Sequence, residues 1–419
     1  MRSATEDTIL RERIPALARH RGAHRWAKAG FNPQDPAVRR MAREHPAGPP
    51  AAGGATGAGG VSFLSNLPPD RFQMNPALFE QSTERQDIPQ ATQVFNGFGS
   101  NFSVRLQNVG VLAMIRCVFS GSLVITTATG TCTVLPGWPY SLLKRVAFNA
   151  NGQTSLIQCN GVTLRARRQR LFRNPAGEII EAAGGAPGVL AAGTYPIQFA
   201  VDIPVSHDMF TGIGWVLAQN PSTYLSLDIA CANQADVFSL TGSATAVLTG
   251  SLFPTITTFA VGQAQAGASA VTVIPDLTVF HGLLDNQFAF QAAGIIQAPL
   301  IRTAGQLVNY AFNLNNSGSE IAPLALTEID FRYGGNRQPR AYNPPSMLVE
   351  KNQQDYSGVV QIKGLTYTYL DFEVDNPVRD LFLPEALVEL QAQVIIPTSV
   401  TVNAGAFLKY VEETLYPAT

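Results

Sequence analysis

The sequence predicts an all-β protein in which one sandwich fold is used twice. Apolar and polar residues alternate with a period of two in many short segments, glycines and prolines punctuate the chain, and two segments recur at similar spacing. Period two places every second residue on a buried face, as in a strand of a sandwich. Helical periodicity is nearly absent after residue 90, and 419 residues suffice for two domains.

The clearest strands begin near residue 100. Phe102–Gln107 and Leu225–Ile229 alternate strictly between apolar and polar side chains. The same alternation covers Thr327–Phe331, Leu370–Val374 and Val388–Val394. Turn signals separate such segments, at Pro136-Gly137, Asn151-Gly152, Asn220-Pro221 and Gly334-Gly335.

Two pairs of segments indicate duplication. Leu143–Gln153 has a counterpart at Leu326–Asn336, each an apolar strand with a central Phe that runs into a Gly/Asn turn. Phe199–Phe210 has a counterpart at Tyr369–Phe382. The displacements are similar and the order is the same, so we expect two copies of one fold.

The N-terminal segment differs from the rest. Residues 1–60 hold ten Lys/Arg against five Asp/Glu, and Pro46–Gly60 has the composition of a flexible linker. Asp35 and Pro36 form an N-cap and first turn for a short helix, and residues 16–28 are a second basic helical candidate. We expect this arm to contact an anionic membrane or neighbouring subunits, and both alternatives stay open. The basic contact residues are Arg11, Arg13, Arg19, Arg21, Arg25, Lys28, Arg39, Arg40 and Arg43.

Composition favours self-association. Hydrophobic residues make up 46% of the chain and charged residues 14%, which leaves much uncharged surface to be covered. The four cysteines lie far apart in apolar stretches, so buried free thiols and folding in a reducing cytoplasm are expected. We expect no membrane-spanning segment, because Arg116 interrupts the most apolar stretch, and no secretory signal at the N-terminus.

Residues for catalysis are sparse. Beyond the arm only His207 and His281 remain, and no nucleophile, zinc-protease or phosphate-loop motif occurs. His20 and His24 have metal-ligand spacing, but basic neighbours favour a solvated arm. We therefore predict no enzyme activity, no cofactor and no metal site.

Two charged clusters in the body have competing interpretations. The first cluster is basic and comprises Arg165, Arg167, Arg168, Arg170 and Arg173. It could bind nucleic acid or lipid head groups, but because no aromatic residues are interleaved with the arginines, a salt-bridge surface between subunits is favoured.

The second cluster is acidic and comprises Asp371, Glu373, Asp375 and Asp380. It could bind calcium, but the solvated face of a strand is favoured. Residues 160–195 and 235–270, rich in Gly and Ala, are expected to form exposed loops.

The order of features over residues 90–419 resembles that of the double jelly-roll major capsid proteins of the tectivirus-like lineage of tailless phages with an internal membrane. The features in order are Val94–Leu106, Gly110–Ile125, Leu142–Gly152, Ala191–Ser206, Leu225–Asn233, Val273–Leu284, Leu307–Gly318 and a strand region from Asn403. The resemblance implies two tandem eight-stranded jelly rolls with a basic, partly helical N-terminal arm. The implied domains are residues 1–60 (arm and linker), 61–92 (connecting segment), 93–260 (first jelly roll) and 261–419 (second jelly roll).

The same resemblance implies a structural role. Three chains would form a pseudo-hexagonal homotrimer that tiles an icosahedral shell around an internal lipid membrane. The implied partners are the chain itself, penton and minor capsid proteins, and lipid head groups at the arm, with no sequence-specific nucleic acid. The protein would fold in the host cytoplasm and reside in the virion capsid.

Two other classes of protein fit the sequence less well. An RNA-virus coat with one shell jelly roll and a protruding domain would carry a more densely basic arm. A carbohydrate-binding or receptor-binding β-sandwich would cluster exposed aromatics, whereas Trp26, Trp138 and Trp215 are scattered.

Overall fold

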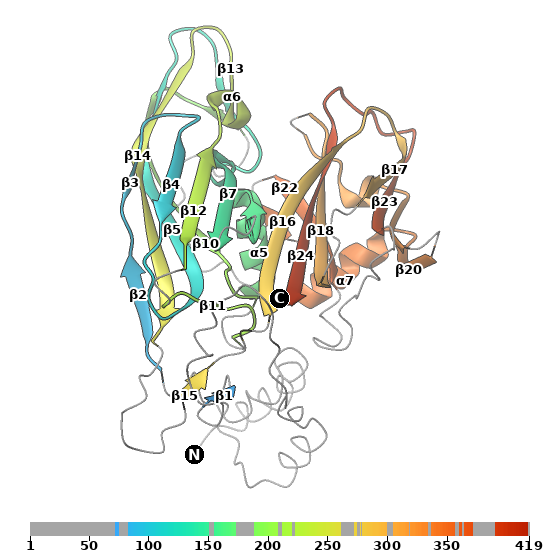
Figure 1. Ribbon diagram of the computed structural model, residues 1–419. Coiled ribbons are helices and arrows are strands. Elements are labelled where there is room, and N and C mark those ends of the chain that lie inside the picture. Colours follow the sequence, from blue (N-terminus) through green and yellow to red (C-terminus); the bar gives the residue numbers. More distant parts are fainter. Residues whose placement is uncertain are drawn as a thin grey trace, which may run out of the picture.

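The computed structural model contains two β-barrels side by side, with their long strands running in nearly the same direction (Figure 1). It describes residues 72–74, 83–150, 155–172, 188–207, 212–219, 223–260, 272–274, 277, 279–299, 305–317, 319–333, 337–356, 360–362, 364–371 and 390–417. Among these residues, no helix has the length and apolar character needed to span a membrane.

The first barrel, called the first roll, contains two sheets that face each other. One is the six-stranded sheet, with the order β10-β5-β14-β2 and with β3 and β11 attached. Its strands are β2 (Arg85–Pro89), β3 (Gln93–Phe95), β5 (Val111–Thr126), β10 (Gly193–Ile203), β11 (Val216–Leu217) and β14 (Thr245–Phe259). The opposing strands are β4 (Asn101–Arg105), β7 (Leu143–Ala150), β8 (Ile157–Cys159) and β12 (Leu225–Cys231), in the order β4-β12-β7-β8.

The second barrel, called the second roll, repeats this connectivity. Its strands β16 (Val279–Ala289), β18 (Gln306–Asn315), β22 (Leu365–Asp371) and β24 (Phe407–Pro417) follow the order β16-β24-β18-β22. The four-stranded sheet opposes them, in the order β17-β23-β19-β20. It consists of β17 (Gly294–Pro299), β19 (Glu328–Tyr333), β20 (Arg337–Tyr342) and β23 (Leu390–Ile396).

In both rolls one sheet holds the first, eighth, third and sixth strands, and the other holds the second, seventh, fourth and fifth, with β2 and β3 together counting as one strand. This is the jelly-roll topology. A helix follows the fifth strand in each roll: α5 (Gly161–Phe172) in the first and α7 (Ser346–Tyr356) in the second. The predicted double jelly roll is therefore confirmed, and the predicted repeats fall on equivalent strands, β7 with β19 and β10 with β22.

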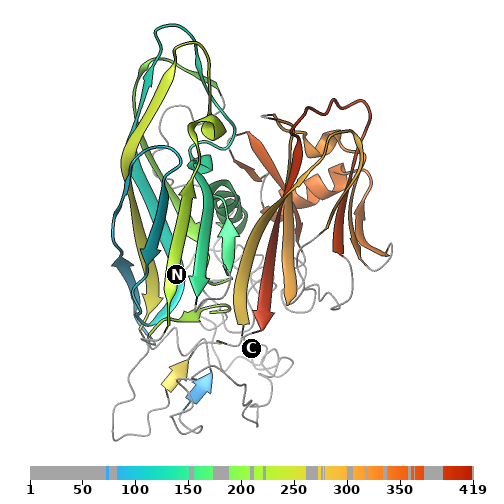
Figure 2. The same ribbon diagram turned by 45° about the horizontal axis from the view of Figure 1, so that its top comes forward.

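The two rolls are joined by one continuous sheet. Strand β8 pairs in parallel with β16, so four strands of the first roll and five strands of the second form one nine-stranded sheet, in the order β21-β22-β18-β24-β16-β8-β7-β12-β4. Figure 2 shows this sheet running through the middle of the molecule, with the six-stranded and four-stranded sheets on opposite sides. We call its two parts the first-roll half (β4, β12, β7, β8) and the second-roll half (β16, β24, β18, β22, β21).

Short elements complete the fold. Strands β6 (Cys132–Val134), β9 (Gly188–Leu190) and β13 (Phe238–Leu240) form a small sheet at one end of the first roll. Strands β1 (Phe72–Met74) and β15 (Thr272–Ile274) pair with each other, and β21 (Val360–Ile362) pairs with β22. The remaining elements are α6 (Gln234–Val237) and the 3-10 helices η3 (Tyr140–Leu142) and η4 (Pro323–Ala325).

Each roll has its own apolar core. The first core includes Phe119, Phe148 and Phe199, and the second includes Phe312 and Phe331. Residues of the second-roll half contribute to both cores because alternate side chains point to opposite faces. All four cysteines are buried free thiols, as the sequence predicted.

A pair of glycines shapes the first core. Gly121 and Gly250 lie opposite each other on β5 and β14, and the Phe119 ring covers them. A Cβ at Gly250 would lie 2.9 Å from Phe119 Cζ and 2.6 Å from the Ser120 carbonyl oxygen. The glycines therefore make room for a ring that stacks on Phe199, with centroids 5.4 Å apart.

The expectation of exposed loops at residues 160–195 and 235–270 is wrong for the parts that form α5 and β14, whereas residues 191–192 and 241–243 are exposed and lie outside helices and strands. Helix α5 is largely buried, and β14 is a long central strand of the six-stranded sheet.

Candidate functional site

The contact between the two rolls contains a buried ionic cluster. From the first roll, α5 supplies Arg167 and Arg170, and from the second roll β24 supplies Glu413. Arg167 Nε donates to Glu413 Oε1 at 2.8 Å, and Arg170 Nη1 donates to Glu413 Oε2 at 3.0 Å. Arg170 Nη2 also lies 2.9 Å from Oδ2 of Asp371, on β22. The first roll thus supplies the cations of the cluster and the second roll the anions.

Helix α5 is held in place to present these arginines. Its start is capped by Asn160, whose side-chain oxygen accepts the Thr163 N–H at 2.8 Å. The Arg165 guanidinium lies 5.6 Å from the centroid of the Tyr140 ring, and Arg168 pairs with Asp202 of β10. Since the first roll fixes the helix on one side, Arg167 and Arg170 reach the second roll on the other.

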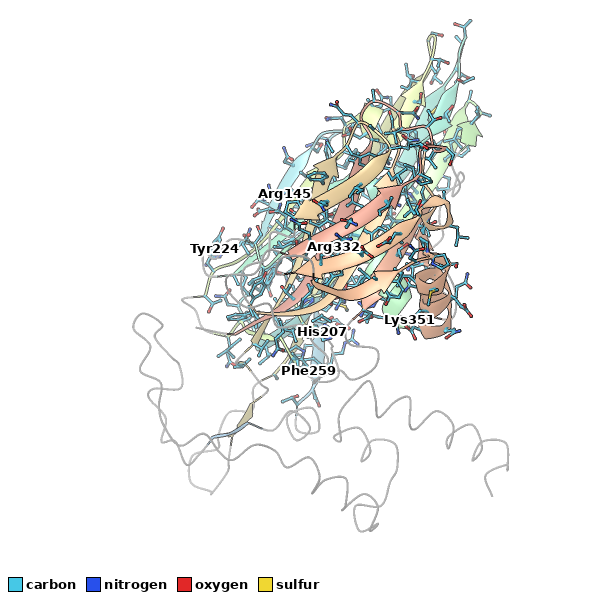
Figure 3. All side chains as sticks on the ribbon, turned by 90° about the vertical axis from the view of Figure 1, so that its right-hand side faces the viewer. Arg145, His207, Tyr224, Phe259, Arg332 and Lys351 are labelled. Atoms are coloured by element: carbon cyan, nitrogen blue, oxygen red, sulfur yellow. The ribbon has the colours of Figure 1, made fainter. Side chains whose placement is uncertain are left out.

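Two histidines complete the cluster. His207 Nδ1 lies 3.2 Å and His281 Nε2 lies 3.0 Å from Glu413 Oε1, and Asn309 donates to Glu413 Oε2. His281 Nδ1 lies 2.7 Å from the carbonyl oxygen of Pro204. His207 is labelled in Figure 3, near the lower end of the barrels. Every member of this group is buried.

The surroundings fix the charge states. Burial, together with the nearby Arg167, lowers the pKa of His281 to about 4, although its hydrogen bond to Glu413 acts in the opposite direction. Burial raises the pKa of Glu413, but Arg167, the two histidines and Arg170 outweigh this effect and hold that pKa well below its usual range. At neutral pH, His281 is therefore neutral and Glu413 is a carboxylate between two guanidinium groups.

The same side chains include the ligand types of a metal site. One ligand atom each of His207, His281 and Glu413 lies within 4.8 Å of the others. However, both oxygens of Glu413 already accept hydrogen bonds from arginines. Two adjacent positive charges disfavour a divalent cation, so the geometry supports an ionic lock between the rolls.

The structure corrects the interpretation of the arginine cluster. Arg165, Arg167 and Arg170 were predicted to lie on a surface between subunits, but they are buried inside the chain. Arg168 pairs with Asp202 of the same chain, and Arg173 lies outside the described residues. A run of arginines usually indicates a solvated face because unpaired buried charges are costly, and here the second roll supplies the partners.

Two further interpretations also change. Asp371 was favoured as a solvated strand residue, but it is buried and pairs with Arg170, while Glu373, Asp375 and Asp380 lie outside the described residues. The sequence predicts no site that contains both His207 and His281, but their rings are 5.6 Å apart and both lie beside Glu413. Sequence reasoning also missed Glu413, because nothing in its local pattern shows that it meets a helix in the other roll.

The nine basic arm residues predicted to contact membrane or subunits all lie outside the described residues, so that prediction stays a prediction. Arg11, Arg13, Arg19, Arg21, Arg25, Lys28, Arg39, Arg40 and Arg43 make up this set.

The topology defines the fold: the chain has the double jelly-roll fold, which viral major capsid proteins also have. Neither the protein families nor the curated proteins compared with the sequence contain a match. Solved structures do match. The atomic structure of Sulfolobus Turreted Icosahedral Virus contains a chain with a TM-score of 0.58 and 17% identity, matched over 80% of this chain and 91% of that one.

Two further structures share the fold. The crystal structure of the STIV MCP matches with a TM-score of 0.52 and 16% identity, over 79% of this chain and 97% of that one. The PBCV-1 virus capsid matches with a TM-score of 0.53 and 12% identity, over 80% of this chain and 94% of that one. These identities are low, so the likeness concerns the fold.

Proposed function

We propose that the chain is the major capsid protein of an icosahedral virus, a structural subunit without enzymatic activity. The observation that carries this proposal is the pair of jelly rolls with the same strand order, fixed to each other by a continuous sheet and a buried ionic lock. Such a rigid pair of barrels suits a shell tile. The solved proteins with the same fold include the STIV MCP and the PBCV-1 capsid.

The proposed working form is a homotrimer, in which six rolls form a pseudo-hexagonal tile. Only 14% of the residues are charged, which supports extensive contact between copies. Removing uncharged surface from water costs less free energy than removing charged surface. Penton and minor capsid proteins are the proposed neighbours of such tiles. The proposed rolls comprise residues 93–260 and 261–419, with β2 adding Arg85–Pro89 to the first roll's sheet.

The arm, residues 1–60, is proposed to lie against the anionic head groups of an internal membrane or against neighbouring subunits. Its excess of basic residues supports lipid contact, at about 1 kcal/mol per residue near an anionic surface. Folding in the host cytoplasm is supported by the four buried free thiols.

Electron microscopy tests the capsid role. We expect the purified full-length protein to form hexagonal tiles or closed particles, and isolated compact monomers at all concentrations would contradict the proposal. Flotation with anionic and neutral liposomes then tests the arm. Flotation with anionic liposomes only, lost on deletion of residues 1–60, is expected for lipid contact, whereas tiles that never float would assign the arm to subunit contacts.

A further inference from the structure

The ionic cluster between the rolls contains two histidines in addition to its fixed charges. His207 Nδ1 lies 3.2 Å and His281 Nε2 lies 3.0 Å from the same oxygen of Glu413. That oxygen also accepts a hydrogen bond from Arg167 Nε at 2.8 Å. The two imidazole rings are 5.6 Å apart, and both are buried. Both titratable rings therefore lie where the two rolls meet.

The two arginines and two carboxylates of the cluster carry equal and opposite charge. Helix α5 contributes Arg167 and Arg170, β24 contributes Glu413, and β22 contributes Asp371. A proton on either histidine adds a positive charge close to Arg167, which also donates to the backbone carbonyl oxygen of His207 at 2.9 Å. Adding positive charge to a buried site that already holds two guanidinium groups is costly.

The surroundings of His281 oppose a proton while the rolls are in contact. Its Nδ1 lies 2.7 Å from the carbonyl oxygen of Pro204. The titratable and charged groups that face the ring are Glu413 on β24, Arg167 on α5 and His207 on the segment after β10. Burial lowers the pKa of His281 to about 4, so the ring binds a proton more readily in water, where the pKa is 6.5. Acid therefore favours any state in which this ring meets water.

The other contacts between the rolls are short or apolar. Backbone pairing of β8 with β16 covers two pairs of residues, and each roll has its own core. At the start of α5, Asp285 accepts the Asn160 N–H at 2.8 Å and lies 3.2 Å from Lys409 Nζ. Apolar side chains of the second roll, such as Leu283 and Val411, also touch the first core. These contacts contain no histidine, so protonation of a histidine acts on the ionic cluster.

We infer that the junction is an acid-operated release, in which protons on His207 and His281 part α5 from β22 and β24 while each roll stays folded. Separation admits water to both rings and weakens their repulsion from the arginines, because water screens charge far better than the protein interior. The release is a property of the single chain. Its consequence for a shell rests on the proposed function: acid would let the two halves of every tile move against each other.

Cys159 supplies a native probe of this separation. It is a buried free thiol on β8, the strand that meets the second roll. Burial raises the pKa of this thiol well above its usual value, and Asp285 and Lys409 of the second roll also act on it, so the thiol lies close to both rolls. Cys117, on β5 in the first core, is also buried and reports unfolding of the first roll itself.

Thiol labelling of the full-length protein measures how often the junction opens. A dipyridyl disulfide reacts with thiols in acid because its leaving group is a weak base. The rate for each cysteine, obtained by peptide mass mapping, is divided by its rate in urea-unfolded protein at the same pH. Between pH 6.5 and 4, we expect the corrected rate of Cys159 to rise towards about a hundredfold per pH unit, about tenfold for each proton bound on opening. Cys117 should stay protected over this range.

Substitution of the histidines removes the protons that drive the release. His207→Gln and His281→Gln keep a polar side chain that does not titrate, so each should lower the slope by about tenfold per pH unit, and H207Q/H281Q should show none. The matched control is Glu320→Gln in the second roll. Burial raises the pKa of Glu320 to about 7, although Thr366 and Asn313 donate to it. This variant removes a different titration and should keep the slope of the parent protein.

Three results would overturn the release. Cys159 that stays protected in acid would show that the junction does not open, and a histidine variant with the slope of the parent protein would assign the acid response to other groups. Cys117 labelled as fast as Cys159 would mean that acid unfolds the first roll as a whole. Each of these results leaves the proposed function intact, because that function is tested separately by the formation of tiles and particles.

Discussion

The six-stranded sheet and the second-roll half have the same strand order, yet their outward faces differ completely. The outward face of the second-roll half is buried within the chain and carries Asp371, Glu413 and His281. The outward face of the six-stranded sheet exposes Val247 and Phe253 and carries the Arg116–Asp202 ion pair near one end. The fold therefore does not determine the chemistry of this face. A face that is covered within the chain can carry matched buried charges, whereas a face that is exposed in the chain carries residues that tolerate water.

The largest effect is expected from removing the anion at the centre of the buried face. Glu413→Leu leaves Arg167 and Arg170 without their shared partner and should lower the free energy of unfolding by about 3–5 kcal/mol. Urea denaturation measures this change. Glu84→Leu, at an exposed position, is the control and should change it by less than about 0.5 kcal/mol. An equal loss of the free energy of unfolding in the two variants would show that the ionic cluster does not hold the two rolls together.

Acid should lower the free energy of unfolding through His281, which lies on the buried face. Burial lowers the pKa of His281 from 6.5 to about 4 in the folded protein, so between these values the unfolded chain binds a proton that the folded chain does not. The contribution of neutral His281 to the free energy of unfolding is therefore fully present above pH 6.5, and about 3 kcal/mol is lost as the pH falls towards 4.

Urea denaturation at pH 7, 5 and 4 measures this loss. His281→Gln should show a shallower dependence on pH, because its side chain does not titrate. Identical pH dependence in the variant and the parent protein would assign the acid sensitivity to other groups.

The attachment of α7 should have an intermediate effect. Asn352 donates to the Tyr369 carbonyl oxygen at 2.8 Å and accepts the Tyr369 N–H at 2.7 Å. Asn352→Ala removes both bonds to a buried strand and should cost about 2 kcal/mol. Hydrogen exchange should show faster exchange across α7 and unchanged exchange across α5, and uniform acceleration in both helices would contradict a local role.

The smallest effect is expected from a matched pair of substitutions on equivalent strands. Val247 on β14 is exposed, whereas Val411 on β24 is buried at the junction. Val247→Thr should change the free energy of unfolding by less than about 0.5 kcal/mol. Val411→Thr places a hydroxyl in an apolar contact and should cost about 1–3 kcal/mol. Similar values for the two variants would mean that the two outward faces are alike.

Much of the fold could be predicted from the sequence. Strands β4, β12 and β19 follow the period-two segments directly, because each has one face in the core. The repeat was visible because Phe148 and Phe331 occupy equivalent core positions on β7 and β19. The contacts of the basic residues of the arm with a membrane or with neighbouring subunits stay a prediction.

The junction could not be predicted, for a physical reason. The local sequence pattern shows whether a residue faces water or protein only when one side of its helix or strand is covered and the other side faces water. The strand β22 is covered on both sides, so Asp371 looks like a solvated residue in the sequence. Helix α5 is enclosed in the same way, and its arginines find carboxylates more than two hundred residues away in the chain. Period and spacing carry no information about such long-range partners.

Light scattering of the purified full-length protein at micromolar concentration tests the central claim most directly, namely that the chain is a shell subunit that associates with further copies of itself. The account predicts a single species with the mass of three chains of 44.9 kDa each. A monodisperse species with the mass of one chain would contradict it.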